Sequence, residues 1–409
     1  MKFITNSIKS CAARIGTLTE FERIPDVVFE TPLVLVYTKG GSVPHLTKDV
    51  FKMVTKNSEL LSVSLPSTIS MLTAIKDLNT SFEYINFLTI HDPAHFTPSG
   101  FQKLDSISLW SRTGRSVLTA NKYMDVIEAF QPDFYVALCD GDTNVNSSRK
   151  RMTNAVNRSN RLLEQCLARH YESKILKSAG ILGAVEGGYD LEARTSSIEY
   201  LKSQPVLGYV IDGLHNNGPD VKDITSEQIK EVNLLPVDKL KVAMGCWNPI
   251  TVLDLIESGV DVFDTSYPYI ATENAEALTF LCDHDDCNND DFSPICSHCE
   301  CLTCKNHTRA YIHHLHHTKE MLHMVLVMIH NVHHYLEFFK AIRKSIKDGT
   351  LDEYKKKINL KFAKSDSNRS DKSADVEDVN PALKSLIKYF CTLLETCFGV
   401  LLPIKKKIK

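Results

Sequence analysis

Three closely spaced cysteines are the part of this sequence whose residue types and spacing best fit a known chemistry. Cys299, Cys301 and Cys304 form a C-x-C-x-x-C cluster. Thiolates bind zinc, and a structural zinc ion takes four protein ligands at the corners of a tetrahedron. Three cysteines in one tight turn can occupy three corners. The cluster therefore predicts one structural zinc ion per chain, with a fourth ligand supplied from elsewhere.

Several residues could supply that fourth ligand. His330 lies in MLHMVLVMIHNV (321–332), an almost wholly apolar helical stretch. An imidazole buried there needs a polar partner, and a metal ion is a suitable one. The spacing also leaves four rivals open, namely Cys287, Cys296, His298 and His323.

Length, composition and charge limit the kinds of protein that this chain can be. The 409 residues are 43% hydrophobic, which is enough for one large core or two domains. The net charge is −3, so the protein does not have the overall positive charge of many nucleic-acid-binding proteins. A local basic face on residues 149–161 would still be able to bind RNA. The N-terminus lacks the apolar run of a signal peptide, so we expect a cytoplasmic, reducing location. In that setting, clustered cysteines indicate metal binding rather than disulfides.

Short apolar runs separated by helical patterns predict a parallel sheet built from βαβ units. The runs are 32–38, 134–140, 181–188, 206–214, 241–246 and 260–266. Between them, Thr119 is predicted to cap one helix and Pro249 to begin another. We favour a (β/α)8 TIM barrel over a doubly wound sheet, because many units occur and no G-x-G-x-x-G follows an early strand. Polar residues past the strand ends are either loop residues or the lining of an active-site mouth: Asp140, Glu186, Asp212 and Asp264.

The pattern changes after the predicted barrel. We expect the main part of the barrel in 1–280, an inserted zinc-binding subdomain and closing helices in 281–350, a basic then disordered linker in 351–380, and an amphipathic C-terminal extension in 381–409. A long helical region is predicted from about 308 to 347. The extension combines an apolar stripe with lysines, which fits packing on the barrel or a partner, or peripheral contact with an anionic membrane such as the mitochondrial outer membrane.

The cysteine cluster also resembles a known family. The stretch CECLTCKNHTRAYIHHL (299–315), followed by MIHN (328–331), is similar to the zinc subdomain of tRNA-guanine transglycosylases. The resemblance covers roughly residues 10–350 and implies a (β/α)8 barrel with an inserted zinc subdomain. It also implies that Cys299, Cys301, Cys304 and His330 bind the zinc ion. Catalytic members exchange guanine at the tRNA wobble position for queuine or a precursor, using an aspartate nucleophile and a second aspartate as acid/base.

Several positions depart from the catalytic pattern. Asp264 stands at the nucleophile position, but the family's Thr-Arg and Ala-Arg pairs are replaced by 269–270 (Tyr-Ile) and 272–273 (Thr-Glu). Thr97 replaces the acid/base aspartate, and Glu186 replaces the glutamine that reads the base. No residue is therefore assigned a catalytic role, and Asp264, at the nucleophile position, is the one candidate.

Other stretches resemble the non-catalytic branch of the family. They are HDP (91–93), WSRTGRS (110–116), LCDGD (138–142), GAVEGG (183–188) and SYPY (266–269). This likeness implies an accessory subunit that forms a heterodimer with the catalytic, queuine-inserting subunit and helps to dock tRNA. Three alternatives stay open: an active transglycosylase using Asp264, a zinc-stabilised protein with no connection to tRNA, and a homodimer when the partner is absent.

Overall fold

The structure is a computed structural model, and it describes residues 1–6, 12–57, 59–69, 84–214, 226–282 and 292–374. The chain divides into two compact units, Met1–Ile358 and Asn359–Lys409. The first unit contains both the predicted barrel and the predicted zinc subdomain. The extension predicted for 381–409 lies outside the described residues, so its membrane or protein contact is still a prediction.

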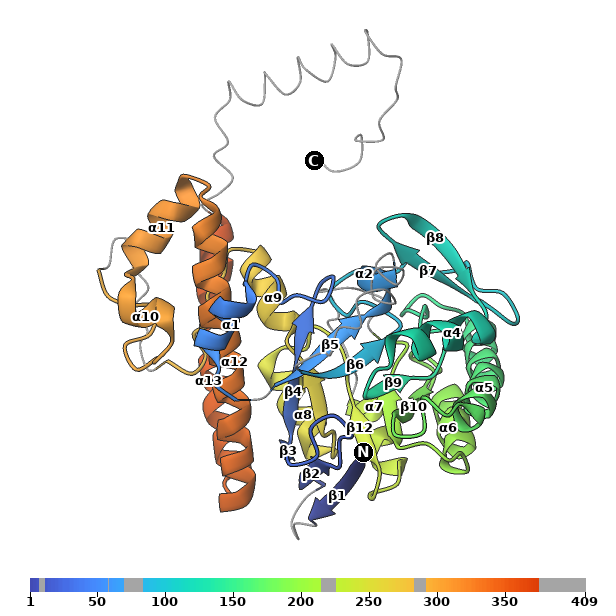
Figure 1. Cartoon of the computed structure of the whole chain (residues 1–409). Helices are drawn as coiled ribbons and strands as arrows, with labels where there is room; N and C mark the ends of the chain where they lie inside the picture. Colours follow the sequence, from blue (N-terminus) through green and yellow to red (C-terminus); the bar gives the residue numbers. More distant parts are fainter. Residues whose placement is uncertain (7–11, 58, 70–83, 215–225, 283–291, 375–409) are drawn as a thin grey trace. The chain divides into compact units, whose positions relative to one another are not determined.

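Eight parallel strands close into a barrel, which confirms the predicted fold class (Figure 1). In chain order they are β4 (Leu33–Thr38), β5 (Leu60–Ser64), β6 (Ile85–Thr89), β9 (Phe134–Val136), β10 (Gly180–Val185), β11 (Gly208–Ile211), β12 (Leu240–Val242) and β13 (Val262–Asp264). The barrel closes where β13 pairs with β4, with Phe263 opposite Val34. Because all strands are parallel, their carboxyl ends meet at one rim.

Helices alternate with these strands. They are α1 (Lys48–Val54), α2 (Leu65–Thr68), α4 (Ala120–Phe130), α5 (Arg149–Glu172), α6 (Leu191–Lys202), α7 (Ser226–Glu231), α8 (Pro249–Glu257) and α9 (Ser266–Glu273). Thr119 caps α4 as its sequence predicts, because its side chain accepts the N–H of Lys122. Asn248 caps α8 in the same way, and Pro249 occupies the first turn, where its missing N–H costs nothing.

Two barrel strands, β5 and β6, were not predicted. Each interrupts its apolar run with a polar residue, Ser62 in LLSVS and Asn86 in INFLT. Both residues are nonetheless only 1% exposed. A strand with a polar residue in a barrel lacks the continuous apolar run by which buried parallel strands are recognised.

A small antiparallel sheet lies at the amino ends of the barrel strands. It consists of β1 (Lys2–Asn6), β2 (Ile15–Thr19) and β3 (Phe29–Thr31). Arg14, just before β2, donates to both carboxylate oxygens of Asp261 at 2.8 and 2.6 Å, and Asp261 directly precedes β13. This bidentate pair fixes the N-terminal segment to the side of the barrel opposite the mouth.

A second helical layer follows the barrel: α10 (Leu302–Asn306), α11 (Arg309–His317), α12 (Met321–Asp348) and α13 (Leu351–Ala374). The helical region predicted from 308 to 347 is present as two helices, because the chain breaks at 318–320, where Lys319 has a φ of 58°. Both α10 and α11 pack against α12. Further along α12, Phe339 contacts Phe263 of β13, with ring centroids 5.6 Å apart.

The linker predicted for 351–380 is also wrong over its described part, because α13 continues to Ala374. Leu351 and Ile358 are buried, and the Tyr354 ring lies 6.2 Å from that of Phe338 on α12. These residues recur every three or four positions and form an apolar stripe that packs on α12. The Ser- and Asp-rich composition that suggested disorder begins only after this stripe.

Among the described residues, no helix is both long enough and apolar enough to cross a lipid bilayer.

Candidate metal centre and barrel mouth

The structure brings Cys299, Cys301, Cys304 and His330 together. Their ligand atoms all lie within 4.8 Å of one another. From His330 Nδ1, the sulfur atoms of Cys304, Cys301 and Cys299 lie 3.3, 3.6 and 3.8 Å away. Zn–S and Zn–N bonds of about 2.3 and 2.0 Å at a tetrahedral angle would separate sulfur and nitrogen by about 3.5 Å. The four atoms therefore fit one tetrahedral zinc ion.

Local structure explains how the four side chains converge. Cys301 is the N-cap of α10, and its sulfur accepts the N–H of Cys304 at 3.3 Å, which folds the two cysteines into one turn. His330 is fully buried on α12, and its Nε2 donates to the carbonyl of Leu278 at 2.8 Å. This bond fixes the ring orientation and leaves Nδ1 facing the thiols, as outer hydrogen bonds do for metal-bound histidines.

The structure does not place the other candidates for the fourth ligand in this cluster, as far as they are described. Cys287 lies outside the described residues. Within the part of the chain that is described, Cys296, His298 and His323 do not belong to the four-residue cluster. His323 instead lies beside His316 of α11, with ring centroids 4.7 Å apart.

Asn331 is a structural residue of this centre that sequence reasoning missed. Its side chain accepts the N–H of Leu278 at 2.8 Å and donates to Thr272 Oγ1 at 2.9 Å and to the carbonyl of Glu276 at 2.8 Å. Thr272 lies on α9, the helix that follows Asp264. Asn331 therefore ties α12 to the barrel beside the metal centre. The sequence signals were its place in the MIHN motif and a polar side chain at the end of an apolar stretch of the helix.

Asp264 lies at the carboxyl end of β13 and is 1% exposed. Its Oδ1 accepts the N–H of Ser266 at 2.6 Å, and its Oδ2 accepts the N–H of Gly245 at 2.7 Å. Gly245 has a φ of 149°, and a Cβ there would meet the Trp247 ring at 2.9 Å. Each carboxylate oxygen thus accepts a backbone N–H, one from the first residue of α9 and one from the loop that follows β12.

The other predicted mouth residues, Asp140, Glu186 and Asp212, are also buried. Burial, together with Asp212 and Asp140, raises the pKa of Glu186 well above its usual value. Its Oε1 accepts the N–H of Gly141 at 2.8 Å. The Cys139 thiol donates to Asp212 at 3.0 Å, and burial and the nearby carboxylates raise the pKa of this thiol. We therefore interpret Cys139 and Asp212 as a hydrogen-bonded pair.

Little space is left beside this pair. The cavity lined by His91, Cys139 and Asp212 has a volume of about 20 Å³. A single water needs roughly 10–15 Å³ on this measure. Pockets for small organic ligands typically measure about 300–1,000 Å³. This cavity therefore has room for a water molecule but not for a purine-like base.

The substituted family positions have structural roles instead. Tyr269 packs against Tyr37 with ring centroids 5.0 Å apart and the rings tilted by 31°, and its hydroxyl lies 3.2 Å from Lys39 Nζ. Glu273 Oε1 lies within hydrogen-bond distance of His45 Nε2, at 2.6 Å. Thr97 lies half-buried in the loop between β6 and the next strand. None of these side chains replaces the arginines or the second carboxyl group that the catalytic pattern requires.

The basic face predicted on α5 is largely neutralised. Arg151 binds both Asp140 and Asp142, and Arg158 binds Asp140. The more exposed arginines also pair with carboxylates, Arg149 with Asp190 and Glu192, and Arg161 with Asp105. Lys355, another predicted basic position, binds Asp254 and Glu257 of α8. These cations mainly hold the fold together and offer little free charge to RNA.

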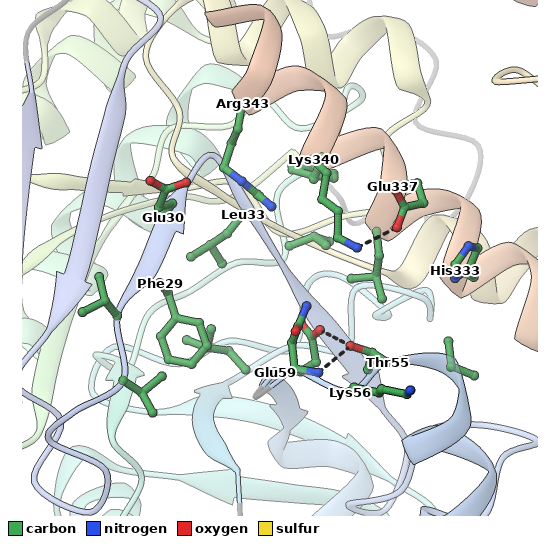
Figure 2. A pocket seen from close by; sticks show the side chains of 18 residues that line it. Phe29, Glu30, Leu33, Thr55, Lys56, Glu59, His333, Glu337, Lys340 and Arg343 are labelled. Atoms are coloured by element: carbon green, nitrogen blue, oxygen red, sulfur yellow. Dashed lines mark hydrogen bonds and ion pairs between the residues drawn. The ribbon is translucent and has the colours of Figure 1, made fainter. Parts of the chain in front are cut away.

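A groove of about 590 Å³ lies away from the mouth, and His333, three residues after His330 on α12, is among the residues that line it (Figure 2). It separates α12 from the amino ends of β4 and β5. Its polar groups satisfy one another: Thr55 Oγ1 donates to Glu59 at 2.7 Å, and Lys340 lies 2.6 Å from Glu337. Acidic and basic residues balance along its walls, and we assign it no chemical role.

Replacing Glu186 by glutamine, the residue of the catalytic pattern, is expected to stabilise the protein more at pH 8 than at pH 5. The raised pKa means that the folded state holds a proton on Glu186 that the unfolded state releases above its ordinary pKa. Wild-type stability is therefore lost as the pH rises towards the folded-state pKa, by at most about 1.4 kcal/mol per pH unit for one proton. Glutamine has no such dependence and can still accept from Gly141.

Urea unfolding of both proteins at pH 5 and pH 8 measures this difference. Glu199→Gln, an exposed site on α6, is the matched control. An equal stability difference between Glu186→Gln and wild type at both pH values would contradict the buried, protonated state.

Comparison with known proteins identifies the family. The family described as queuine tRNA-ribosyltransferase matches residues 9–364. The chain belongs to this family. A protein of Aedes aegypti named queuine tRNA-ribosyltransferase accessory subunit 2 is 36% identical over 410 residues, covering 93% of this chain and 97% of its own. A protein of Drosophila mojavensis with the same name is 38% identical over 374 residues, covering 85% and 89%. The resemblance inferred from the zinc-subdomain motif is thereby confirmed.

Proposed function

We propose that this chain is the accessory subunit of a heterodimeric queuine tRNA-ribosyltransferase and does not itself exchange bases. The catalytic partner exchanges guanine for queuine at the tRNA wobble position, and this subunit supports it and helps to dock the tRNA. The names of the relatives support the accessory role. The observation that carries the proposed inactivity is the cavity beside Cys139 and Asp212, because its volume of about 20 Å³ among the described residues is too small for a base.

The chemistry of base exchange explains why the remaining residues are insufficient. A covalent mechanism needs a free carboxylate nucleophile and a separate group that carries a proton. Both oxygens of Asp264 accept backbone N–H groups, and Thr97 at the acid/base position has no ionisable group near neutral pH. Glu186 is buried and faces other carboxylates, so its proton serves to relieve charge repulsion within the mouth.

The four-residue metal centre is proposed to hold one structural zinc ion. Three cysteines and one histidine are a common structural ligand set, and four protein ligands leave no position for a reactive water. The zinc ion would supply no chemistry to a substrate. Its role would be to hold α10 and α11 against α12.

The alternative is an active transglycosylase that uses Asp264. A guanine-exchange assay with labelled guanine separates the two functions. The accessory role predicts no exchange by this chain alone and exchange when the catalytic subunit is added. Exchange by the purified chain alone would favour the alternative.

We expect Asp264→Asn to leave the exchange rate of the reconstituted heterodimer within about threefold of wild type. Asparagine keeps an oxygen that can accept one of the two backbone N–H groups, and no bond to RNA is lost if Asp264 is not a nucleophile. Loss of an essential covalent nucleophile can instead cost on the order of 10⁶ in rate. A decrease of that size, with the heterodimer still assembled, would show that this subunit does chemistry.

Location and further contacts are proposals as well. We propose a cytoplasmic protein, because its clustered cysteines suit a reducing compartment. Homodimer formation without the catalytic partner and contact of residues 381–409 with a mitochondrial outer membrane are further proposals. Size measurement of the purified chain and flotation with anionic liposomes test them.

A further inference from the structure

Two arginines differ from the others in the described part of the chain. Most arginines bind carboxylates, and Arg309 and Arg343 donate to backbone carbonyls. The carboxylate-bound ones are Arg14, Arg23, Arg149, Arg151, Arg158, Arg161, Arg169 and Arg194. Arg112 and Arg115 are exposed, and neither has a carboxylate or carbonyl partner among the described residues. Their charges are therefore available to an external anion.

Both arginines lie on a two-stranded ribbon outside the barrel sheet. The ribbon pairs β7 (Ile107–Ser111) with β8 (Gly114–Leu118), and Figure 1 shows it as a separate projection. Arg112 and Thr113 form the turn, and Gly114 with a φ of 103° lets the chain reverse there. Arg115 stands directly opposite Trp110.

An aromatic side chain supports one of the two cations. The Arg115 guanidinium lies 5.3 Å from the centroid of the Phe101 ring, and the Trp110 ring meets Phe101 edge-on at 5.2 Å. Phe101 is 43% exposed, so the contact does not bury the cation. A guanidinium stacked on an aromatic ring keeps its donors free for a phosphate while its orientation is restricted.

The ribbon is held in place at its base. Ser108 Oγ donates to the carbonyl of Phe101 at 2.8 Å, and the Ser108 N–H donates to Gln102 Oε1 at 2.6 Å. Gln102 in turn donates to the carbonyl of Asp140 at 3.2 Å, which is at the barrel rim. The two free cations therefore stand on a support that is fixed to the mouth before any partner binds, which reduces the entropy lost on binding.

We propose that this arginine ribbon, Arg112 and Arg115 with Phe101 and Trp110, contacts the backbone of the tRNA bound by the heterodimer. The proposal rests on the proposed function. Free guanidinium groups beside an exposed aromatic ring are typical of surfaces that follow an RNA strand, where cations meet phosphates and rings meet unstacked bases. The arginines of α5 cannot bind RNA phosphates in the same way unless their ion pairs with carboxylates are first broken. If the ribbon instead bound an acidic protein surface, the two cations would be sufficient and the exposed aromatic ring would not be needed.

The test compares two double variants of this subunit in the reconstituted heterodimer. Arg112→Ala with Arg115→Ala removes the two free cations, and Arg149→Ala with Arg161→Ala removes two exposed but ion-paired cations. Affinity for labelled tRNA is measured over a series of salt concentrations. The ribbon variant is expected to bind about tenfold more weakly near 0.1 M salt. The slope of log K against log salt should fall by about 1.4, the value for two phosphate contacts on a single strand. The control should match wild type.

Three outcomes would overturn the proposal, and they are distinguishable. Unchanged affinity and slope in the ribbon variant would exclude the RNA contact while leaving the accessory function intact. Failure of the ribbon variant to assemble with the catalytic subunit would make the ribbon a protein interface. If the two wild-type subunits neither assemble nor bind tRNA together, the proposed function fails along with the ribbon contact.

Discussion

Replacing Cys301 by serine is expected to remove most of the zinc from the purified protein. A serine hydroxyl is a poor zinc ligand, and Cys301 is both a predicted ligand and the N-cap of α10, so the turn that presents Cys304 also weakens. Zinc binding to small Cys/His peptides is worth roughly 10–16 kcal/mol, and most of the order in α10 and α11 would depend on it. Elemental analysis measures zinc per chain, and limited proteolysis detects opening of residues 292–320.

The matched control is Cys166→Ser. Cys166 is equally buried but lies on α5, away from the metal centre. It should keep the zinc content of wild type. The barrel should remain folded in Cys301→Ser, because Phe339 of α12 still packs on Phe263 and the Tyr335 hydroxyl still donates to the carbonyl of Trp247. Undiminished zinc in Cys301→Ser would count heavily against the assigned ligands.

Replacing Asp140 by asparagine is expected to lower the free energy of unfolding by about 3 kcal/mol. Asp140 is fully buried and binds both Arg151 and Arg158, whose side chains are 22% and 12% exposed. Removing one partner of a buried ion pair typically costs about 3–5 kcal/mol, because the other charge is left uncompensated. We expect the lower end, because Asp142 also binds Arg151 and the arginines retain some contact with water.

Urea unfolding followed by circular dichroism measures this loss. Asp105→Asn is the matched control, because it removes the partner of Arg161 on the same helix, where both side chains are about half exposed. An exposed pair contributes at most about 1 kcal/mol. If Asp140→Asn costs no more than Asp105→Asn, the buried network does not stabilise the mouth as described.

The sequence was most informative for residues whose structural role depends on the residues next to them in the chain. His330 stood out because an imidazole in an apolar helix needs a partner, and the structure brings it to the three cysteines. Thr119 and Pro249 marked helix starts through rules that depend on one or two adjacent residues. The barrel itself followed from repeated apolar runs, even though β5 and β6 were missed.

The failures all involve partners that are distant in the sequence. On α5, a row of arginines indicates a basic face, and nothing local shows that Asp140 and Asp142, in the loop after β9, neutralise it. Ser62 and Asn86 interrupt the apolar runs of β5 and β6, so the two strands were not recognised. The sequence alone does not show that closure of the barrel buries these polar side chains. Asn331 looked like an ordinary polar residue until Thr272 and Leu278 were seen beside it.

The adjacency of His330 and Asn331 fixes the rotational phase of α12. Successive residues of a helix point about 100° apart, so His330 faces the cysteines while Asn331 faces α9 and the segment at 276–278. Any rotation of α12 about its axis that improves one set of contacts breaks the other. The metal centre and the barrel thus contact the same helix on two sides. Correct placement of α12 at one of them therefore requires correct placement at the other.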